Sequence, residues 1–137
     1  VPGWPDVGVS VSHSGGAAVA LAVPSGRVGI DRERVVERPE HFAEMWLSTA
    51  ERALAPDAMR QTLVWCAKEA VLKALGTGMA ISPRFVQVRA IGERRLTVVL
   101  SGPAWERFDT MGAGQLAVDW ATEDSEIVVV TAFFSAA

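Results

Sequence analysis

The chain has 137 residues, of which half are hydrophobic and about a fifth are charged, and its formal net charge is -3. This length predicts one domain that can bury its own core, and the composition is ordinary for a globular protein. The negative charge argues against non-specific nucleic-acid binding. Because there is no apolar run of about 18 residues and no signal-peptide pattern, we expect neither a membrane partner nor export.

Cys66 is the only cysteine, which argues against a disulfide framework and a cysteine-based zinc site. A reducing, cytoplasmic setting is therefore expected. Residues 1–6 (VPGWPD) predict an entry loop, or the end of a linker from a longer protein, because they hold two prolines and a glycine and the chain starts at Val1. We expect one domain over residues 1–137, with the five tryptophans in its core.

Three strands are expected in the first quarter of the chain. Valines alternate with small residues over 7–12, and an apolar run covers 17–23, a pattern typical of a hairpin. Residues 27–33 predict a third strand. Asp31 and Glu33 are two residues apart, so their side chains point to the same face of that strand.

Helices are expected in the middle of the chain. Pro39 can open a short helix that runs through Trp46. The capping-box pattern at 48–51 (STAE) predicts a second helix. A long helix is predicted over 58–75, because Asp57 can cap its start and a glycine, Gly76, follows its last residue.

The C-terminal half predicts strands again, over 85–91, 96–100, 116–121 and 127–134. Residues 103–108 are expected to form a short helix or a loop. The predicted fold class is therefore α+β: a largely antiparallel sheet with a long helix packed on it.

The long helix carries a charged pair near its end. Glu69 and Lys73 are four residues apart and share a helix face, with Trp65 one turn earlier on the same side. Taken alone, this pattern is more typical of a surface ion pair beside a core tryptophan.

Three carboxylates, from Asp31, Glu33 and Glu69, converge if the long helix packs across the third strand. Carboxylates held together repel, and a hard divalent cation such as Mg²⁺ relieves the repulsion. Since Mg²⁺ commonly binds substrate phosphates as well, Lys73 would point at the same phosphates. The alternative is that Asp31 and Glu33 line a solvated strand face.

The tripeptide Ser12-His13-Ser14 follows a strand and precedes two glycines. Hydroxyls, an imidazole and turn amides can together bind phosphate. The alternative is a polar turn with a hydrogen-bonded histidine. His41 has no companion at a metal-ligand spacing, so we expect it at the surface.

Three motifs in order give a resemblance to the 4'-phosphopantetheinyl transferases. They are VSHS at 11–14, GIDRE at 29–33, and WCAKEA at 65–70 followed by Lys73. The last fits the family signature W-x-x-K-E-A-x-x-K. The family moves the 4'-phosphopantetheine arm of coenzyme A to a serine of an acyl or peptidyl carrier protein, and it releases adenosine 3',5'-bisphosphate.

The resemblance implies roles by position. Asp31, Glu33 and Glu69 are implied Mg²⁺ ligands, with Mn²⁺ as a substitute, and Glu69 is also an implied base for the attacking serine. Lys73 is implied to contact the pyrophosphate and to help the leaving phosphate. Asp31, Glu69 and Lys73 are thus the implied catalytic residues.

Coenzyme A contacts are implied for four residues. Ser12 and His13 match phosphate contacts, with His13 placed at the 3'-phosphate, and Lys73 matches the pyrophosphate contact. Lys68 is a further implied contact, although its side chain lies about 100° round the helix from Glu69.

The motif order is that of the Sfp-type branch, in which two similar halves share one chain, whereas the compact size is that of the AcpS-type branch. Only 12 residues precede His13, where the Sfp type has nearly a whole half. We therefore expect a homo-oligomer, a trimer first and a dimer second, or docking to a preceding domain of a longer synthase.

The resemblance implies a carrier from a polyketide, fatty-acid or peptide synthase as the partner. Two rival functions stay open at this point. One is a different Mg²⁺-dependent phosphoryl-transfer enzyme. The other is a non-catalytic remnant that binds a carrier protein or a partner half.

Overall fold

The computed structural model describes residues 8–14, 17–23 and 27–136 of the chain. The expected entry loop over residues 1–6 lies outside this part. The strands are β1 (Gly8–Ser14), β2 (Ala17–Val23), β3 (Arg27–Arg34), β4 (Val86–Ile91), β5 (Arg95–Leu100), β6 (Ala113–Glu123) and β7 (Ile127–Ala136). The helices are α1 (Glu40–Trp46), α2 (Thr49–Leu54), α3 (Ala58–Leu75) and α4 (Gly102–Thr110), with the 3₁₀ turns η1 (Gly78–Ala80) and η2 (Pro83–Phe85).

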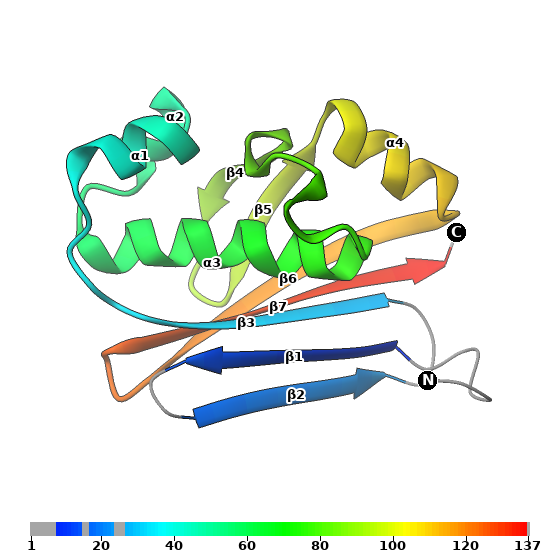
Figure 1. Ribbon diagram of the computed structural model, residues 1–137, viewed down its shortest axis with the longest axis horizontal. Helices are drawn as coiled ribbons and strands as arrows, with labels where there is room; N and C mark the ends of the chain where they lie inside the picture. The colour runs from blue at the N-terminus through cyan, green and yellow to red at the C-terminus, as the bar shows by residue number, and fades with distance from the viewer. Residues whose placement is uncertain (1–7, 15–16, 24–26, 137) are drawn as a thin grey trace.

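The main sheet has the order β3-β7-β6-β5-β4, and every neighbouring pair in it is antiparallel. β1 and β2 form the predicted hairpin as a separate two-stranded sheet. In Figure 1 this hairpin lies beside β3, at the edge of the main sheet, while α3 and the shorter helices lie on the other side of β3. The predicted α+β class is thereby confirmed.

The long helix begins and ends where local signals predict. The Asp57 side chain accepts a hydrogen bond from the Arg60 amide at 2.8 Å and caps the first turn of α3. Gly76 ends the helix in the left-handed conformation, with φ of 73°, which favours glycine. α2 has the predicted capping box between Ser48 and Glu51.

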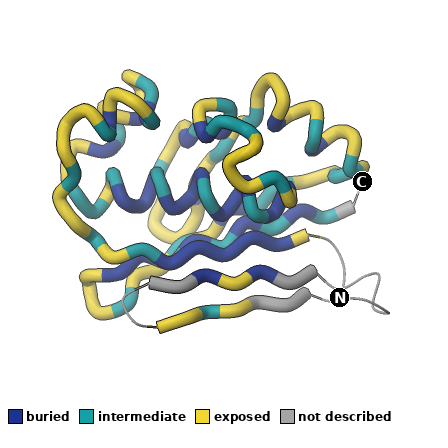
Figure 2. Tube along the Cα trace, viewed as in Figure 1, coloured by how far each residue is buried: buried dark blue, intermediate teal, exposed yellow. Residues whose placement is uncertain are grey.

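The hydrophobic core lies between α3 and the sheet (Figure 2). β7 supplies alternate residues to it, because side chains two apart share a face of a strand. The fully buried members from these two elements include Leu63, Val64, Ala67, Ala70, Val71, Val128, Val130 and Ala132.

α3 approaches β3 closely at one glycine. A Cβ atom on Gly29 would lie 1.8 Å from the carbonyl oxygen of Ala70 and 2.6 Å from the amide nitrogen of Ala74. Only glycine fits there, so the backbone of β3 lies directly against the backbone of α3. This contact brings the side chains of β3 within reach of those on α3.

Three expectations are refined by the structure. Residues 102–110 form a helix, α4, which settles the choice between helix and loop. β6 is longer than predicted, because its pairing with β7 extends over Ala113–Glu123. The tryptophans do not fill the core in the described part of the chain: Trp105 is 51% exposed, and the other three there are half-buried.

In that part, no helix is long and apolar enough to cross a membrane.

Candidate active site

Three carboxylates meet between β3 and α3. Asp31 and Glu33 come from β3 and Glu69 from α3, and one oxygen from each lies within 4.8 Å of the others. In the sheet register Asp31 lies opposite Val130 and Glu33 opposite Val128, so both carboxylates are on the face that α3 covers. The convergence expected from strand period and helix packing is therefore present.

Asp31 is the most buried of the three, at 3% exposure. Its Oδ1 accepts hydrogen bonds from Ser12 Oγ at 3.1 Å and from Lys73 Nζ at 3.0 Å. Its Oδ2 is also buried and has no hydrogen-bond partner among the described residues. Because a buried carboxylate oxygen without a partner is costly, this atom marks a place for a cation or a donor.

Lys73 lies beside the cluster, with its side chain 31% exposed. Its ammonium donates to Asp31, to the Ile30 carbonyl at 3.0 Å and to the Val11 carbonyl at 3.2 Å. It therefore connects α3 to both β1 and β3. A positive charge is thus fixed at the edge of the acidic cluster.

β1 is attached to β3 through serine side chains. Ser10 Oγ accepts a hydrogen bond from the Ile30 amide at 2.9 Å, and Ser12 Oγ accepts one from the Arg32 amide at 3.0 Å. These hydroxyls satisfy amides on the edge of β3 that faces away from β7. Sequence reasoning did not identify Ser10, although its spacing of two from Ser12 was visible.

Ser12, from the predicted phosphate-binding tripeptide, lies at the acidic cluster and donates a hydrogen bond to Asp31. His13 lies in β1, opposite Ala18, but its side chain lies outside the described residues. Its contact with coenzyme A stays a prediction. His41 is exposed, as expected.

The cluster shifts the titration of its own carboxyl groups. Burial, followed by the negative charge of Asp31, raises the pKa of both Glu33 and Glu69 to about 7. Lys73 and a hydrogen bond from the Trp65 side chain partly oppose the rise in the pKa of Glu69. Burial and mutual repulsion are the expected causes of a raised pKa in carboxyl groups that are held close together.

Arg38 is a neighbour of the cluster that sequence reasoning missed. Its charge lowers the pKa of both Glu33 and Glu69, opposing burial. The guanidinium donates to Thr62 Oγ1 at 2.6 Å and lies over the Phe42 ring, 5.2 Å from its centroid. Arg38 lies outside all three motifs, so no spacing rule pointed to it.

Trp65 packs against the first helix in the same region. Its ring lies 5.2 Å from Phe42 in an edge-on contact and 5.7 Å from Trp46, measured between centroids. These contacts connect α1 to the face of α3 that carries Glu69. Trp65 therefore links the acidic cluster to the first helix.

Lys68 is buried on another face of α3. Its side chain is fully buried, and its ammonium donates to Glu51 and to the Pro83 and Val86 carbonyls, on the side of α3 that faces α2 and β4. The helix turns by about 100° per residue, so Lys68 points away from the cluster that Glu69 joins. The contact between Lys68 and coenzyme A that the resemblance implies stays a prediction, and in this structure the ammonium is bonded within the protein instead.

The donor set suits a hard divalent cation. It consists of carboxylate oxygens alone, with neither histidine nor thiolate among its members. Asp31, which belongs to it, also has a buried oxygen, Oδ2, with no hydrogen-bond partner in the described part of the chain. Mg²⁺ and Mn²⁺ prefer such oxygen ligands. Asp31, Glu33 and Glu69 fit that group on the evidence of their own geometry.

Comparison with known proteins places the chain in a family. A model of the 4'-phosphopantetheinyl transferase superfamily matches residues 27–127, about three quarters of the sequence. The chain belongs to this superfamily, and the enzyme class expected from its motifs, a 4'-phosphopantetheinyl transferase, is confirmed. No curated protein matched the chain in a separate search.

Solved structures of holo-[acyl-carrier-protein] synthases share the fold. The Helicobacter pylori enzyme, solved in complex with coenzyme A, is 22% identical with a TM-score of 0.66, and the match covers 79% of this chain and 99% of that chain. The Neisseria meningitidis enzyme is 20% identical with a TM-score of 0.66, over 80% and 97% of the two chains. The Mycobacterium tuberculosis enzyme is 26% identical with a TM-score of 0.58, over 81% and 97%.

Proposed function

We propose that this chain transfers the 4'-phosphopantetheine arm of coenzyme A to a serine of an acyl or peptidyl carrier protein, and that the reaction needs Mg²⁺ or Mn²⁺. One observation carries the proposal. The oxygens of Asp31, Glu33 and Glu69 lie within 4.8 Å of one another, with Lys73 bound to Asp31 at 3.0 Å. Membership of the transferase superfamily supports the same reaction.

Asp31, Glu33 and Glu69 would hold the divalent cation. When bound, the cation supplies charge neutralisation at the phosphate oxygens of the substrate. Asp31 Oδ2 supports this assignment, because it is buried and the described residues offer it no hydrogen-bond partner, a place that a cation would fill. The raised pKa of Glu33 and of Glu69, to about 7 in each case, indicates the repulsion that a cation would relieve.

Lys73 and the β1 segment would bind coenzyme A. The Lys73 ammonium lies at the edge of the cluster and is partly exposed, so it can add a charge-assisted contact to a phosphate oxygen. His13, on β1, is assigned to the 3'-phosphate by its motif. The Helicobacter pylori enzyme of the same fold was solved with coenzyme A, which supports this ligand.

Glu69 is assigned as the base for the carrier serine. The serine oxygen forms a bond to the phosphorus that carries the pantetheine arm, and the bond from that phosphorus to the bridging oxygen breaks. The serine proton passes to Glu69 directly or through water, and adenosine 3',5'-bisphosphate leaves.

The site is proposed to be completed by another chain. In the described structure, β2 pairs only with β1, and its residues Ala17, Ala18 and Ala20 are exposed. An apolar edge strand of this kind favours pairing with a further chain, and identical chains usually close by rotational symmetry. A trimer is expected first and a dimer second; a preceding domain of a longer synthase is the alternative.

Intact-mass spectrometry tests the proposed reaction. The chain is incubated with coenzyme A, Mg²⁺ and an apo carrier, over a panel of fatty-acid, polyketide and peptide carriers. A mass gain of one phosphopantetheinyl group on the carrier supports the proposal. Binding of a carrier without any mass gain would favour a non-catalytic remnant, and phosphoryl transfer from another donor would favour a different Mg²⁺-dependent enzyme.

A further inference from the structure

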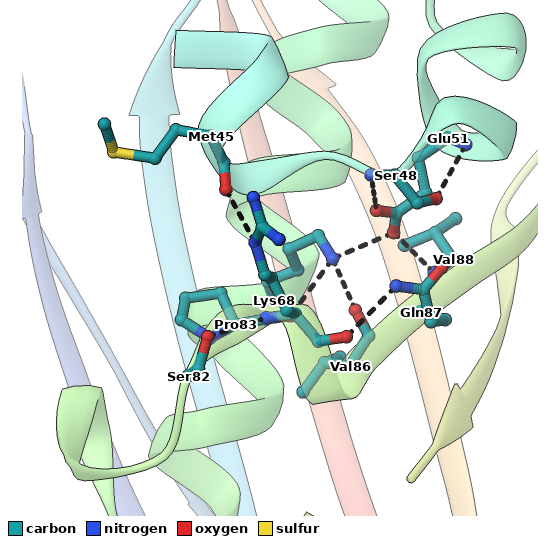
Figure 3. Close-up of polar contacts among 10 residues, drawn as sticks. Met45, Ser48, Glu51, Lys68, Ser82, Pro83, Val86, Gln87 and Val88 are labelled. Atoms are coloured by element: carbon teal, nitrogen blue, oxygen red, sulfur yellow. Dashed lines mark hydrogen bonds and ion pairs between the residues drawn. The ribbon is translucent and has the colours of Figure 1, made fainter.

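A second charged pair, Lys68 and Glu51, lies on the side of α3 that faces α2 and β4 (Figure 3). Lys68 Nζ lies 2.9 Å from Glu51 Oε2, and both side chains have 0% exposure. Lys68 belongs to the transferase motif, whereas Glu51 belongs to α2. The reaction described above assigns no task to either residue.

Lys68 connects α3 to the segment that leads into β4. Besides Glu51, its ammonium donates to the Pro83 carbonyl at 3.1 Å and to the Val86 carbonyl. Burial lowers its pKa, while Glu51 acts in the opposite direction. An ammonium has three N–H donors, so all three have an acceptor within the protein.

Glu51 is equally well satisfied. Its Oε1 accepts from the Ser48 amide at 2.9 Å in the capping box of α2, and its Oε2 accepts from the Val88 amide of β4 at 2.8 Å. Through this one carboxylate, α2 and β4 are both fixed to Lys68. The pair therefore joins α2, α3, η2 and β4 at one buried point.

A buried ion pair of this kind adds little to the stability of a fold. The cost of removing two charges from water is large, and a well-packed apolar replacement is often as stable or more so. A fully satisfied buried network instead favours one arrangement over its neighbours, because any other arrangement leaves a charge unpaired. The Lys68–Glu51 pair would therefore act by fixing the rotation of α3 about its axis, if another part of the protein depends on that rotation.

The acidic cluster depends on this rotation, because Glu69 comes from α3 while Asp31 and Glu33 come from β3. The contact of α3 with β3 is close, since Gly29 lies against backbone atoms of Ala70 and Ala74. This approach fixes the distance between the two elements, whereas the rotation of the helix is set by side chains on its several faces, and Lys68 is the one bonded to α2 and to the start of β4. Lys68 and Glu69 are neighbours, about 100° apart around the axis, so anchoring one sets the direction of the other.

We propose that Lys68 and Glu51 are positioning residues of the transferase site. Their buried pair holds α3 at the rotation that brings Glu69 to Asp31 and Glu33, and Lys73 to Asp31. This inference rests on the proposed function only in taking those three carboxylates as the cation site. The inference assigns to Lys68, the first lysine of the W-x-x-K-E-A-x-x-K motif, the role of orienting α3.

The test uses the double variant Lys68→Met/Glu51→Gln, which removes both charges and keeps an oxygen for the Ser48 amide. The matched control is Arg95→Met/Asp119→Asn, which removes an exposed ion pair of 2.8 Å between β5 and β6. The readouts are Tm, Mn²⁺ affinity by electron paramagnetic resonance, and kcat and KM for transfer.

We expect the double variant to fold with a lowered Tm, because the Val88 amide and the Pro83 and Val86 carbonyls lose their partners. Its Mn²⁺ affinity and kcat should each fall by about 10-fold or more, with KM for the carrier unchanged, and the control should match the unmodified chain. A folded double variant with unchanged Mn²⁺ affinity and kcat would overturn the inference, since the pair would then act in stability alone.

If the double variant fails to fold, the Mn²⁺ affinity of the single variant Lys68→Arg tests the inference in its place. The guanidinium keeps the charge beside Glu51 but does not reproduce the directions of the three ammonium bonds. Lowered Mn²⁺ affinity in this folded variant supports the inference, and unchanged affinity overturns it. For the unmodified chain, Mn²⁺ binding without any transfer would refute the proposed function alone, whereas absence of Mn²⁺ binding would refute both.

Discussion

Lys73 Nζ lies 3.0 Å from Asp31 Oδ1, while Oδ2 of the same carboxylate is buried and has no partner among the described residues. One oxygen of this carboxylate is thus bound to a lysine, while the other has no hydrogen-bond partner in the described part of the chain. This division allows Asp31 to hold a divalent cation without giving up its contact with Lys73. The cation and the lysine can then act on the same phosphate groups.

Lys73→Met should weaken coenzyme A binding. A charge-assisted contact contributes about 1.5–3 kcal/mol, which corresponds to roughly a 10- to 150-fold loss in affinity. Isothermal titration with coenzyme A measures this loss. Arg95→Met, which removes an exposed cation distant from α3, is the control and should bind normally. Equal affinities for all three proteins would remove Lys73 from the phosphate site.

His13→Ala should affect coenzyme A more than dephospho-coenzyme A, because only the former has the 3'-phosphate that the motif assigns to His13. The measurement is KM for both ligands in the variant and in the unmodified chain. His41→Ala, at an exposed position on α1, is the control. A similar rise in KM for both ligands would mean that His13 does not recognise this phosphate.

The stability of the metal-free chain should fall as pH rises from about 4.5 to about 7. Over this range Glu33 and Glu69 keep protons in the folded state, with a pKa of about 7, that the unfolded chain has already lost. Below about pH 4.5 both states are protonated and the effect vanishes. Mg²⁺ should therefore raise Tm more at pH 8 than at pH 5, as followed by thermal unfolding.

The double variant Glu33→Gln/Glu69→Gln is the control for this pH effect. It removes both titrating groups, so its Tm should vary less between pH 5 and 8 and should respond little to Mg²⁺. If Tm of the unmodified chain instead rises across this range without metal, the two carboxyl groups are not held together as the structure has them.

Gly29→Ala should separate α3 from β3. Its Cβ would lie 1.8 Å from the Ala70 carbonyl oxygen, a backbone atom that can move only with the helix. Overpacking of this kind costs about 1–3 kcal/mol or more, and urea unfolding measures it. Thr97→Ala, exposed on β5, should change stability by about 0.5 kcal/mol at most. A Gly29→Ala variant as stable as Thr97→Ala would contradict the close approach.

Much of the fold was predictable because its signals are local. Asp57 and Gly76 define α3, and the alternation of Asp31 and Glu33 on a strand places both carboxylates on the face that the helix covers. The acidic cluster followed from these two patterns. The resemblance to the transferases then gave the roles that spacing alone left open.

Other features depend on contacts between distant residues. The motif indicated that Lys68 matters, but its partner Glu51 lies 17 residues earlier on a different helix, and no periodicity connects them. Arg38 reaches the cluster from the segment before α1 through Thr62, outside every motif. Similarly, the attachment of β1 to β3 uses the Ser10 hydroxyl instead of a backbone ladder, which strand patterns do not predict.

The central claim is that Asp31, Glu33 and Glu69 hold the cation that phosphopantetheinyl transfer requires. The most direct test is the rate of transfer to an apo carrier by chain stripped with a chelator, measured by intact mass as Mg²⁺ is added back. We predict no transfer before addition, full recovery in the unmodified chain, and a rate about 100-fold lower or worse in Asp31→Ala at saturating Mg²⁺. Transfer by the stripped chain, or normal turnover by Asp31→Ala, would contradict the assignment.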